Sequence, residues 1–164
     1  MSPADWALRP LKRYADFRGR APRAEYWWYV LATAIVGTGL RFIDIKLNHP
    51  IVGNHGPLGL TFAAVLLIPG LAVVVRRMHD SGRTGWWCMM SVSGYIFSYG
   101  VRPLGLWHLQ SLSTLESLAA IGGMALWCSL AIIFFILLLA QGDKGSNRYG
   151  PDPYGRTDLE EVFA

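Results

Sequence analysis

The sequence predicts an all-α membrane protein with four transmembrane helices and with its N and C termini in the cytoplasm. Three observations indicate this fold class. Hydrophobic residues make up 52% of the 164 residues and charged residues only 16%, against roughly a quarter in a typical soluble domain. The apolar residues form four long segments, and the charged residues gather at the chain ends and in one central stretch. Lysine and arginine fall almost entirely on one side of these segments.

Residues 1–25 are predicted to form a basic N-terminal segment on the cytoplasmic side. This segment contains six of the 15 lysines and arginines and no long apolar run. It therefore lacks the hydrophobic region of a signal peptide. We expect the apolar segment that follows to stay in the protein as a membrane-spanning helix.

The first two apolar segments, 26–45 and 57–75, are predicted to span the membrane. A helix rises about 1.5 Å per residue, so about 20 residues cross the ~30 Å hydrocarbon core of a bilayer. The first segment opens beside the aromatic sequence EYWWY, which is typical of the headgroup level. The second contains Pro69 and Gly70, which predict a kink whose freed carbonyl is satisfied by neighbouring groups.

Two charged residues, Arg41 and Asp44, lie near the outer end of the first segment. They are three positions apart and therefore share one helix face. A charge inside a membrane segment indicates a functional role by default. This pair can instead neutralise itself and reach outward to the interface, so we favour a structural role.

The third and fourth segments are predicted to span at 86–101 and 118–140, which completes a transmembrane domain at 26–140 with a cytoplasmic tail at 141–164. The third segment is short and carries serines that suit packing against other helices, whereas the fourth runs 23 residues without a charge. Leucines recur at every third position between the two. This stripe predicts either a short amphipathic helix near 104–117 on the outer surface or an N-terminal extension of the fourth helix.

The distribution of lysine and arginine predicts the orientation of the chain. Twelve of these residues lie in the N-terminal segment, in the loop between the second and third segments, and in the tail. Only Lys46 and Arg102 lie in the opposite connections. Positively charged residues are concentrated in cytoplasmic connections, so we expect both termini in the cytoplasm.

Several function classes find no support in the sequence. The formal charge of +4 could indicate nucleic-acid binding, but the basic residues border apolar segments, where anionic lipid headgroups are the nearer partner. The four histidines and two cysteines lack the spacing of a metal or redox site, and no phosphate-binding or dinucleotide motif occurs. We predict no nucleic-acid partner, no metal and no cofactor.

Three polar stretches, 17–29, 76–87 and 142–155, are predicted to meet at the cytoplasmic face. Their charged side chains allow three interpretations: an ion-paired seam with arginines that reach lipid phosphates, a site for a bound phosphate or carboxylate, or a docking surface for another protein. The candidate residues for binding an anion, a lipid or a partner are Arg18, Arg20, Arg23, Glu25, Arg76, Arg77, His79, Asp80, Arg83, Arg148, Tyr149 and Asp152.

His79 and Asp80 are the residues that most resemble a catalytic pair, because histidine titrates near neutral pH and can act as acid or base. No nucleophile or metal-ligand spacing accompanies them. We therefore interpret His79 as a structural loop residue and predict no catalytic residue.

The tail is predicted to contribute to the same face. Its sequence RYGPDPYG is stiffened by Pro151 and Pro153, and we expect it to fold back on the loop at 76–85. The last residues, 157–164, are expected to fray.

The three polar stretches read FRGRAPRAEYW, RRMHDSGRTGWW and GDKGSNRYGPDP. In this order around four apolar segments they resemble the bacterial domain-of-unknown-function family 805, with its FxGRAxRxEYW, RRLHDxGRSGWW and GxxGxNRYGPDP motifs. The resemblance covers about 10–154, and Met78 and Thr84 stand where leucine and serine are usual. It implies a four-helix protein of the bacterial inner membrane and no assigned activity.

From these observations we predict a non-enzymatic accessory or scaffold protein. It would bind a protein partner, an anionic lipid headgroup or a second copy of itself through the arginine-rich cytoplasmic face. Two alternatives stay open: an oligomeric transporter or channel, supported by the Pro69-Gly70 pair and the polar third segment, and a headgroup-modifying enzyme that uses His79 and Asp80.

Overall fold

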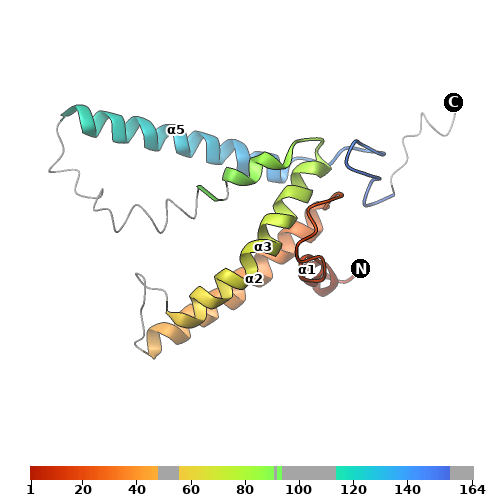
Figure 1. Cartoon of the computed structure of the whole chain (residues 1–164), viewed down its shortest axis with the longest axis horizontal. Helices are drawn as coiled ribbons and strands as arrows, with labels where there is room; N and C mark the ends of the chain where they lie inside the picture. The colour runs from red at the N-terminus through yellow and green to blue at the C-terminus, as the bar shows by residue number, and fades with distance from the viewer. Residues whose placement is uncertain (48–55, 91, 94–113, 156–164) are drawn as a thin grey trace.

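A computed structural model describes residues 1–47, 56–90, 92–93 and 114–155. In these ranges the chain is helical and has no named strand. The elements are α1 (Pro3–Lys12), α2 (Arg23–Lys46), α3 (Pro57–Asp80), the short 3-10 helix η1 (Gly85–Cys88) and α5 (Thr114–Leu139). Figure 1 shows α2 and α3 side by side as a hairpin, with α5 diverging from them at an angle from the place where it meets the end of α3.

Three of these helices are long and apolar enough to cross a membrane: α2, α3 and residues Ile121–Leu139 of α5. The predicted spans at 26–45, 57–75 and 118–140 are therefore confirmed as helices. The chain is an integral membrane protein in which α3 extends five residues past its predicted end, to Asp80.

The predicted span at 86–101 begins in η1, and its residues 91 and 94–101 lie outside the described ranges. Residues 104–113 of the predicted amphipathic helix also lie outside them, as do the last residues of the tail. The helix that follows, α5, begins at Thr114, four residues before the predicted start, which agrees with an N-terminal extension.

The N-terminus of α3 is capped by Asp44 of α2. The Asp44 carboxylate is buried and accepts hydrogen bonds from the backbone N–H groups of Leu58 (3.2 Å) and Gly59 (2.8 Å). Among the described residues Asp44 forms no ion pair with Arg41, which is exposed, so the expected self-neutralising pair is wrong. The first N–H groups of a helix have no helical acceptor, and a negative charge is stabilised beside them, so the N-terminus of α3 provides the partner for Asp44.

The carbonyl that Pro69 frees in α3 is satisfied from the N-terminal segment, as expected of neighbouring groups. Pro69 has no backbone N–H, so the carbonyl oxygen of Val65, four residues earlier, loses its helical donor. The hydroxyl of Tyr14 donates to this oxygen. The hydroxyl of Tyr29 in α2 donates to the next carbonyl, that of Leu66, at 3.3 Å.

Tyr14→Phe is expected to lower the free energy of unfolding by about 1 kcal/mol, because it leaves the Val65 carbonyl without a donor in apolar surroundings. Tyr29→Phe is the matched control. It removes the donor to the Leu66 carbonyl, but this carbonyl keeps a helical donor, the backbone N–H of Gly70 four positions later. Thermal unfolding in detergent should show the larger loss for Tyr14. Equal losses would contradict a special role for the proline carbonyl.

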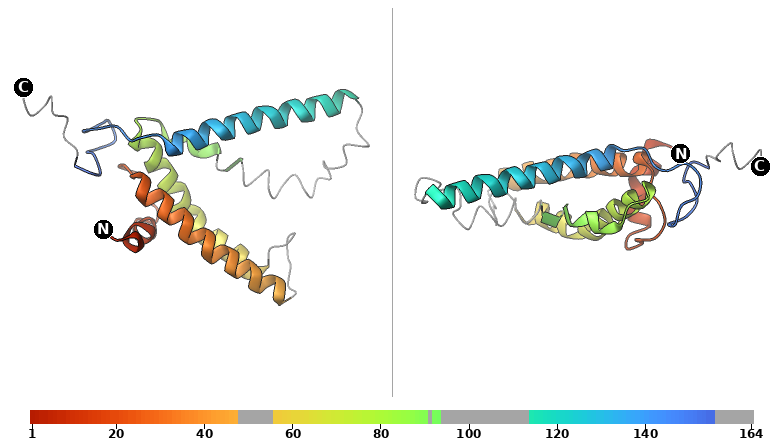
Figure 2. Two further views of the ribbon diagram at one scale, coloured as in Figure 1. Left: turned by 180° about the vertical axis from the view of Figure 1, so that it is seen from behind. Right: turned by 90° about the horizontal axis from the view of Figure 1, so that it is seen from above.

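The helix α1 was not predicted from the sequence. Its N-terminus is a capping box: the Ser2 hydroxyl accepts from the Asp5 N–H at 3.2 Å, and the Ser2 N–H donates to the Asp5 carboxylate at 2.9 Å. Pro3 occupies the first turn, where its missing N–H costs nothing. Figures 1 and 2 show α1 lying crosswise beside the α2–α3 hairpin, near the end where α5 meets α3.

The buried core lies at this same end of the molecule. Its larger cluster joins Val74, Val75 and Met78 of α3 with Cys88 and with Phe134, Leu137 and Leu138 of α5. Away from this cluster the helices expose apolar side chains such as Ile35 and Ile121, as expected of surfaces that face lipid. The packing thus fixes the three helices relative to one another where the polar stretches converge.

Candidate functional site

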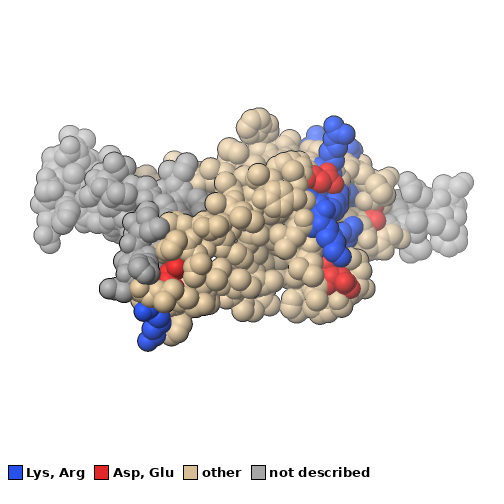
Figure 3. Space-filling model, turned by 60° about the horizontal axis from the view of Figure 1, so that its bottom comes forward, with Lys and Arg blue, Asp and Glu red and all other residues tan. Residues whose placement is uncertain are grey.

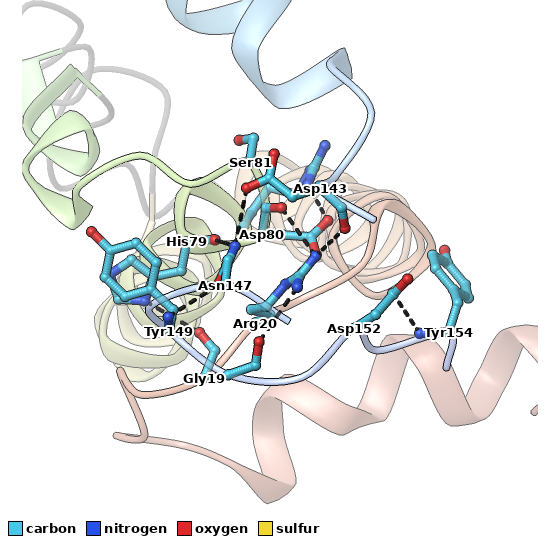
Figure 4. Close-up of polar contacts among 12 residues, drawn as sticks. Gly19, Arg20, His79, Asp80, Ser81, Asp143, Asn147, Tyr149, Asp152 and Tyr154 are labelled. Atoms are coloured by element: carbon cyan, nitrogen blue, oxygen red, sulfur yellow. Dashed lines mark hydrogen bonds and ion pairs between the residues drawn. The ribbon is translucent and has the colours of Figure 1, made fainter. Parts of the chain in front are cut away.

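The three polar stretches converge at the end of the hairpin that carries the C-terminus of α3. Figure 4 shows Arg20, from the segment between α1 and α2, pointing between the end of α3 and the tail that follows α5. The site is therefore built from segments more than 120 residues apart in the chain, because the Arg20 guanidinium donates to the Asp143 carbonyl at a separation of 123 residues.

Asp80 lies at the centre of this site. Its carboxylate accepts from Arg20 Nε at 3.0 Å and from Arg77 Nη1 at 2.7 Å, and only 2% of the residue is exposed. Its backbone carbonyl accepts from the Asp143 N–H at 2.8 Å, which ties the tail to the end of α3. Two guanidinium groups on one buried carboxylate place more positive than negative charge here, so the remaining donors need further acceptors.

Backbone carbonyls of the tail supply those acceptors for Arg20. Its Nη1 donates to Gly145 O at 2.7 Å and to Gly150 O at 3.4 Å, and its Nη2 donates to the carbonyls of Asp80 and Asp143. Gly145 and Gly150 have φ angles of 67° and 138°, a region that L-residues with a side chain rarely adopt. These two glycines let the tail turn its carbonyls toward the guanidinium.

Arg77 and Arg23 hold the C-terminus of α5. Arg77 Nε donates to Leu138 O at 3.2 Å, and Arg77 Nη2 donates to Ala140 O, which also accepts from Arg23 Nε at 3.0 Å. The last carbonyls of a helix have no helical donor and carry partial negative charge. The two arginines satisfy them and fix α5 against α3.

The tail folds back on the loop at 76–85, as the sequence predicted, and it closes over His79. Asn147 Nδ2 donates to His79 O at 3.0 Å, and Arg148 Nη2 donates to Gly82 O at 2.9 Å. The ring of Tyr149 stacks on the imidazole with centroids 3.8 Å apart and planes 6° from parallel, and the Arg148 guanidinium lies 4.7 Å from the Tyr149 centroid. The imidazole Nδ1 lies 3.2 Å from Gly19 O.

A second buried ion pair lies beside the first site. Glu25 of α2 and Arg76 of α3 are both fully buried, with Arg76 Nη2 3.0 Å from Glu25 Oε1. Arg9 of α1 approaches Glu25 Oε2 at 3.5 Å. This pair joins α1, α2 and α3. A buried pair of this kind is costly to break, because the surviving charge would stay in apolar surroundings.

Five exposed basic side chains at this end of the molecule form what we call the basic rim; two of them, Arg23 and Arg148, also donate to backbone carbonyls. Its members are exposed: Arg18, Arg23, Arg83, Lys144 and Arg148. Figure 3 shows most of the charged side chains on this face gathered at one end of the molecule, with a smaller charged group at the opposite end and a long uncharged surface between them. The aromatic side chain of Trp86, close to Arg83 in the chain, is 78% exposed.

Asp16 shapes the loop that presents Arg18. Its carboxylate accepts from Arg13 Nη2 at 2.6 Å and from the Arg18 N–H at 3.0 Å. The hydrogen bond from Arg13 is the main cause that lowers the pKa of the Asp16 carboxyl below its usual value. Asp16 therefore stays charged near neutral pH, and the loop stays closed between Arg13 and Arg18.

The structure divides the predicted site residues into three groups. Arg20, Arg77, Asp80, His79 and Tyr149 come together, with Arg148 and Arg23 at the edge. Glu25 and Arg76 form a separate pair, and Arg18 and Arg83 point outward. Asp152 lies in the following turn, where its side chain accepts from the Tyr154 N–H at 2.9 Å.

Sequence reasoning missed Asn147, Gly142 and Arg9 as members of these networks. Asn147 bonds both His79 O and, at 3.1 Å, the Asp143 carboxylate. Gly142 is buried against Asp80, and a Cβ there would stand 2.5 Å from Asp80 Cγ. The sequence shows that the tail is rich in glycine. It does not show that Gly142 packs against Asp80, because that contact depends on the tertiary fold.

Comparison with known proteins gives consistent matches over nearly the whole chain. Residues 14–151 match the family described as "Protein of unknown function (DUF805)". The inner membrane protein YhaH of Escherichia coli K12 is 30% identical over 149 residues, covering 91% of this chain and 96% of YhaH. The inner membrane protein YhaI of the same strain is 32% identical over 149 residues, covering 90% and 94%. No solved structure matches.

Proposed function

This chain belongs to the DUF805 family, whose description assigns no activity, and from the geometry of its charged end we propose that it is a non-enzymatic accessory protein whose basic rim binds anionic lipid headgroups. Its relatives YhaH and YhaI are inner membrane proteins, and this chain likewise is a multi-pass protein of the bacterial inner membrane. The proposal includes four transmembrane helices, the third within 86–101, and both termini in the cytoplasm. The one-sided distribution of lysine and arginine supports this topology.

The observation that carries the proposal is the division of the arginines into an inward and an outward set. Arg20 and Arg77 are buried, and their guanidinium groups donate hydrogen bonds to the Asp80 carboxylate and to backbone carbonyls. Among the described residues, the exposed guanidinium groups of Arg18 and Arg83 form no ion pair. Their donors therefore remain available to a ligand from outside the chain, and a guanidinium matches phosphate in shape and charge.

The position of the rim favours lipid over a soluble anion. The rim borders helices whose exposed surfaces are apolar, which supports a position where headgroups meet acyl chains. Trp28 (40% exposed) and Trp86 are aromatic side chains of the kind enriched at this level. A cationic side chain near an anionic membrane surface gains about 1 kcal/mol. Each basic residue of the rim contributes little binding energy by itself, and the contributions of several residues on one face add up to a headgroup-binding site.

The geometry gives less support to an enzyme that uses His79 and Asp80. The two side chains have separate partners: the imidazole stacks on Tyr149, and the carboxylate binds Arg20 and Arg77. A general base must lie within hydrogen-bond reach of the proton that it removes. Both groups are instead engaged in joining the tail to the end of α3, which is a structural role.

Native mass spectrometry of the protein, extracted gently from its own membrane, tests the proposal. We expect Arg18→Gln/Arg83→Gln to lose bound phosphatidylglycerol or cardiolipin while bound phosphatidylethanolamine is unchanged, because the variant removes two outward cations. The control is Arg41→Gln/Lys46→Gln, which removes two exposed cations at the other end of α2 and should keep the anionic lipid. Equal retention in both variants, or loss of a co-purifying protein in place of lipid, would overturn the proposal.

A further inference from the structure

The helix α1 carries an apolar strip that the rest of the described chain leaves uncovered. Pro10 is buried, and Trp6 and Ala7 are half-buried, so this side of α1 faces the hairpin. Leu8 and Leu11, three positions apart, are 50% and 38% exposed. Residues three positions apart are neighbours on a helix surface, so these two leucines form one apolar strip on the ten-residue helix.

Successive residues of a helix are about 100° apart, which places the side chains of α1 on three distinct sides. Pro10, Trp6 and Ala7 occupy the side toward α2 and α3. Leu8 and Leu11 occupy the side next to it. The polar Asp5 and Lys12, both exposed, occupy the remaining side. One helix thus presents a protein-facing side, an apolar side and a hydrated side, as expected of a helix at a boundary between protein, lipid and water.

The location of α1 matches that boundary. It lies crosswise to α5, which extends along the molecule (Figure 1), and α2 begins eleven residues after α1 ends. Arg9 ties it to Glu25 in the first turn of α2, and Tyr14 ties the segment after it to Val65. The pair of Arg9 with Glu25 therefore holds α1 near the end where the basic rim lies, and the Tyr14 hydrogen bond holds the following segment against the middle of α3.

We propose that α1 lies in the bilayer interface, with Leu8 and Leu11 inserted among the upper acyl chains and Lys12 at the lipid phosphates. Amphipathic helices with this distribution of side chains bury their apolar side about 5–10 Å into the boundary layer. A bilayer is favoured over a protein partner, because two leucines expose far less area than the roughly 1,200 Å² of a stable protein interface. The bilayer is also already present around α2.

This inference stands apart from headgroup binding by Arg18 and Arg83, because it rests on apolar contact. Single cysteines for a fluorescent probe are placed at Leu8→Cys and, as references, at Ile35→Cys and Lys144→Cys, with Cys88 and Cys128 replaced by alanine. Ile35 is 65% exposed within the span of α2, and Lys144 is exposed in the tail. The full chain is reconstituted in vesicles of phosphatidylethanolamine and phosphatidylglycerol and quenched by nitroxide lipid or by aqueous iodide.

We expect the probe at position 8 to be quenched by nitroxide attached near the headgroup and protected from iodide, whereas position 35 responds to nitroxide deep in the chains and position 144 to iodide. The same quenching pattern in the Arg18→Gln/Arg83→Gln variant would support insertion of α1 independently of headgroup binding by the basic rim. Iodide quenching at position 8 equal to that at 144 would overturn it. Protection from both quenchers would also overturn it, because it would mean that a protein surface covers the strip.

Discussion

Asp80→Asn is expected to lower the free energy of unfolding by about 3–5 kcal/mol, the usual cost of removing one partner from a buried ion pair. The carboxylate of Asp80 is the shared acceptor of Arg20 and Arg77, both buried. An asparagine keeps the size of the side chain and removes its charge, so two guanidinium groups remain in apolar surroundings without a counterion. The melting temperature in detergent should fall by roughly 6–20 °C.

Asp16→Asn is the matched control for this prediction. It also removes a carboxylate that binds an arginine, at 2.6 Å from Arg13 Nη2, but 40% of its side chain is exposed. Exposed ion pairs contribute about 0–1 kcal/mol, so its melting temperature should stay close to that of the unchanged protein. If the two variants melted alike, the network around Asp80 would not be the feature that holds the three segments together.

Gly142→Ala is expected to destabilise the protein by at least the ~1–3 kcal/mol of an overpacked buried site. The added Cβ would fall on the Asp80 carboxylate, 2.5 Å from its Cγ. Either the carboxylate leaves Arg20 and Arg77, or the tail moves away from the end of α3. Both movements break hydrogen bonds in the buried network, so the effect should approach that of Asp80→Asn.

The same substitution at Gly39 provides the control, because a Cβ there meets nothing within 4 Å. Gly39 lies inside α2, where alanine favours the helix by up to about 1 kcal/mol. We expect Gly39→Ala to keep or raise the melting temperature and Gly142→Ala to lower it. Limited proteolysis of the tail would show whether the tail moves, and an intact, fully stable Gly142→Ala protein would refute the close packing.

The sequence was sufficient for features that depend on long periodic patterns. The spans in α2, α3 and α5 follow from apolar length, and the folding of the tail onto the loop at 76–85 follows from the proline-stiffened RYGPDPYG segment. The meeting of the three polar stretches follows from topology, since connections on one side of a membrane share one face. Such inferences need only the order and length of segments.

The partners of individual charges could not be predicted, because they depend on distances across the fold. Spacing alone paired Asp44 with Arg41, whereas the orphan N–H groups of α3, brought close by Gly56 and Gly59, provide better donors. The arginines of the site looked equivalent in sequence, yet Arg20 is buried and Arg18 is exposed. The helix α1 did have a local signal in Ser2, Pro3 and Asp5, and the many basic residues around it obscured that signal.

The reach of Arg20 has a consequence for how the protein is made. Its acceptors at Asp143, Gly145 and Gly150 lie 123, 125 and 130 residues further along the chain. During synthesis this guanidinium emerges early and finds its tail acceptors only after the last described helix has been inserted. The charged end therefore closes as a final step of biogenesis, and a nascent chain released before residue 150 would keep an open, protease-sensitive end that quality-control machinery can recognise.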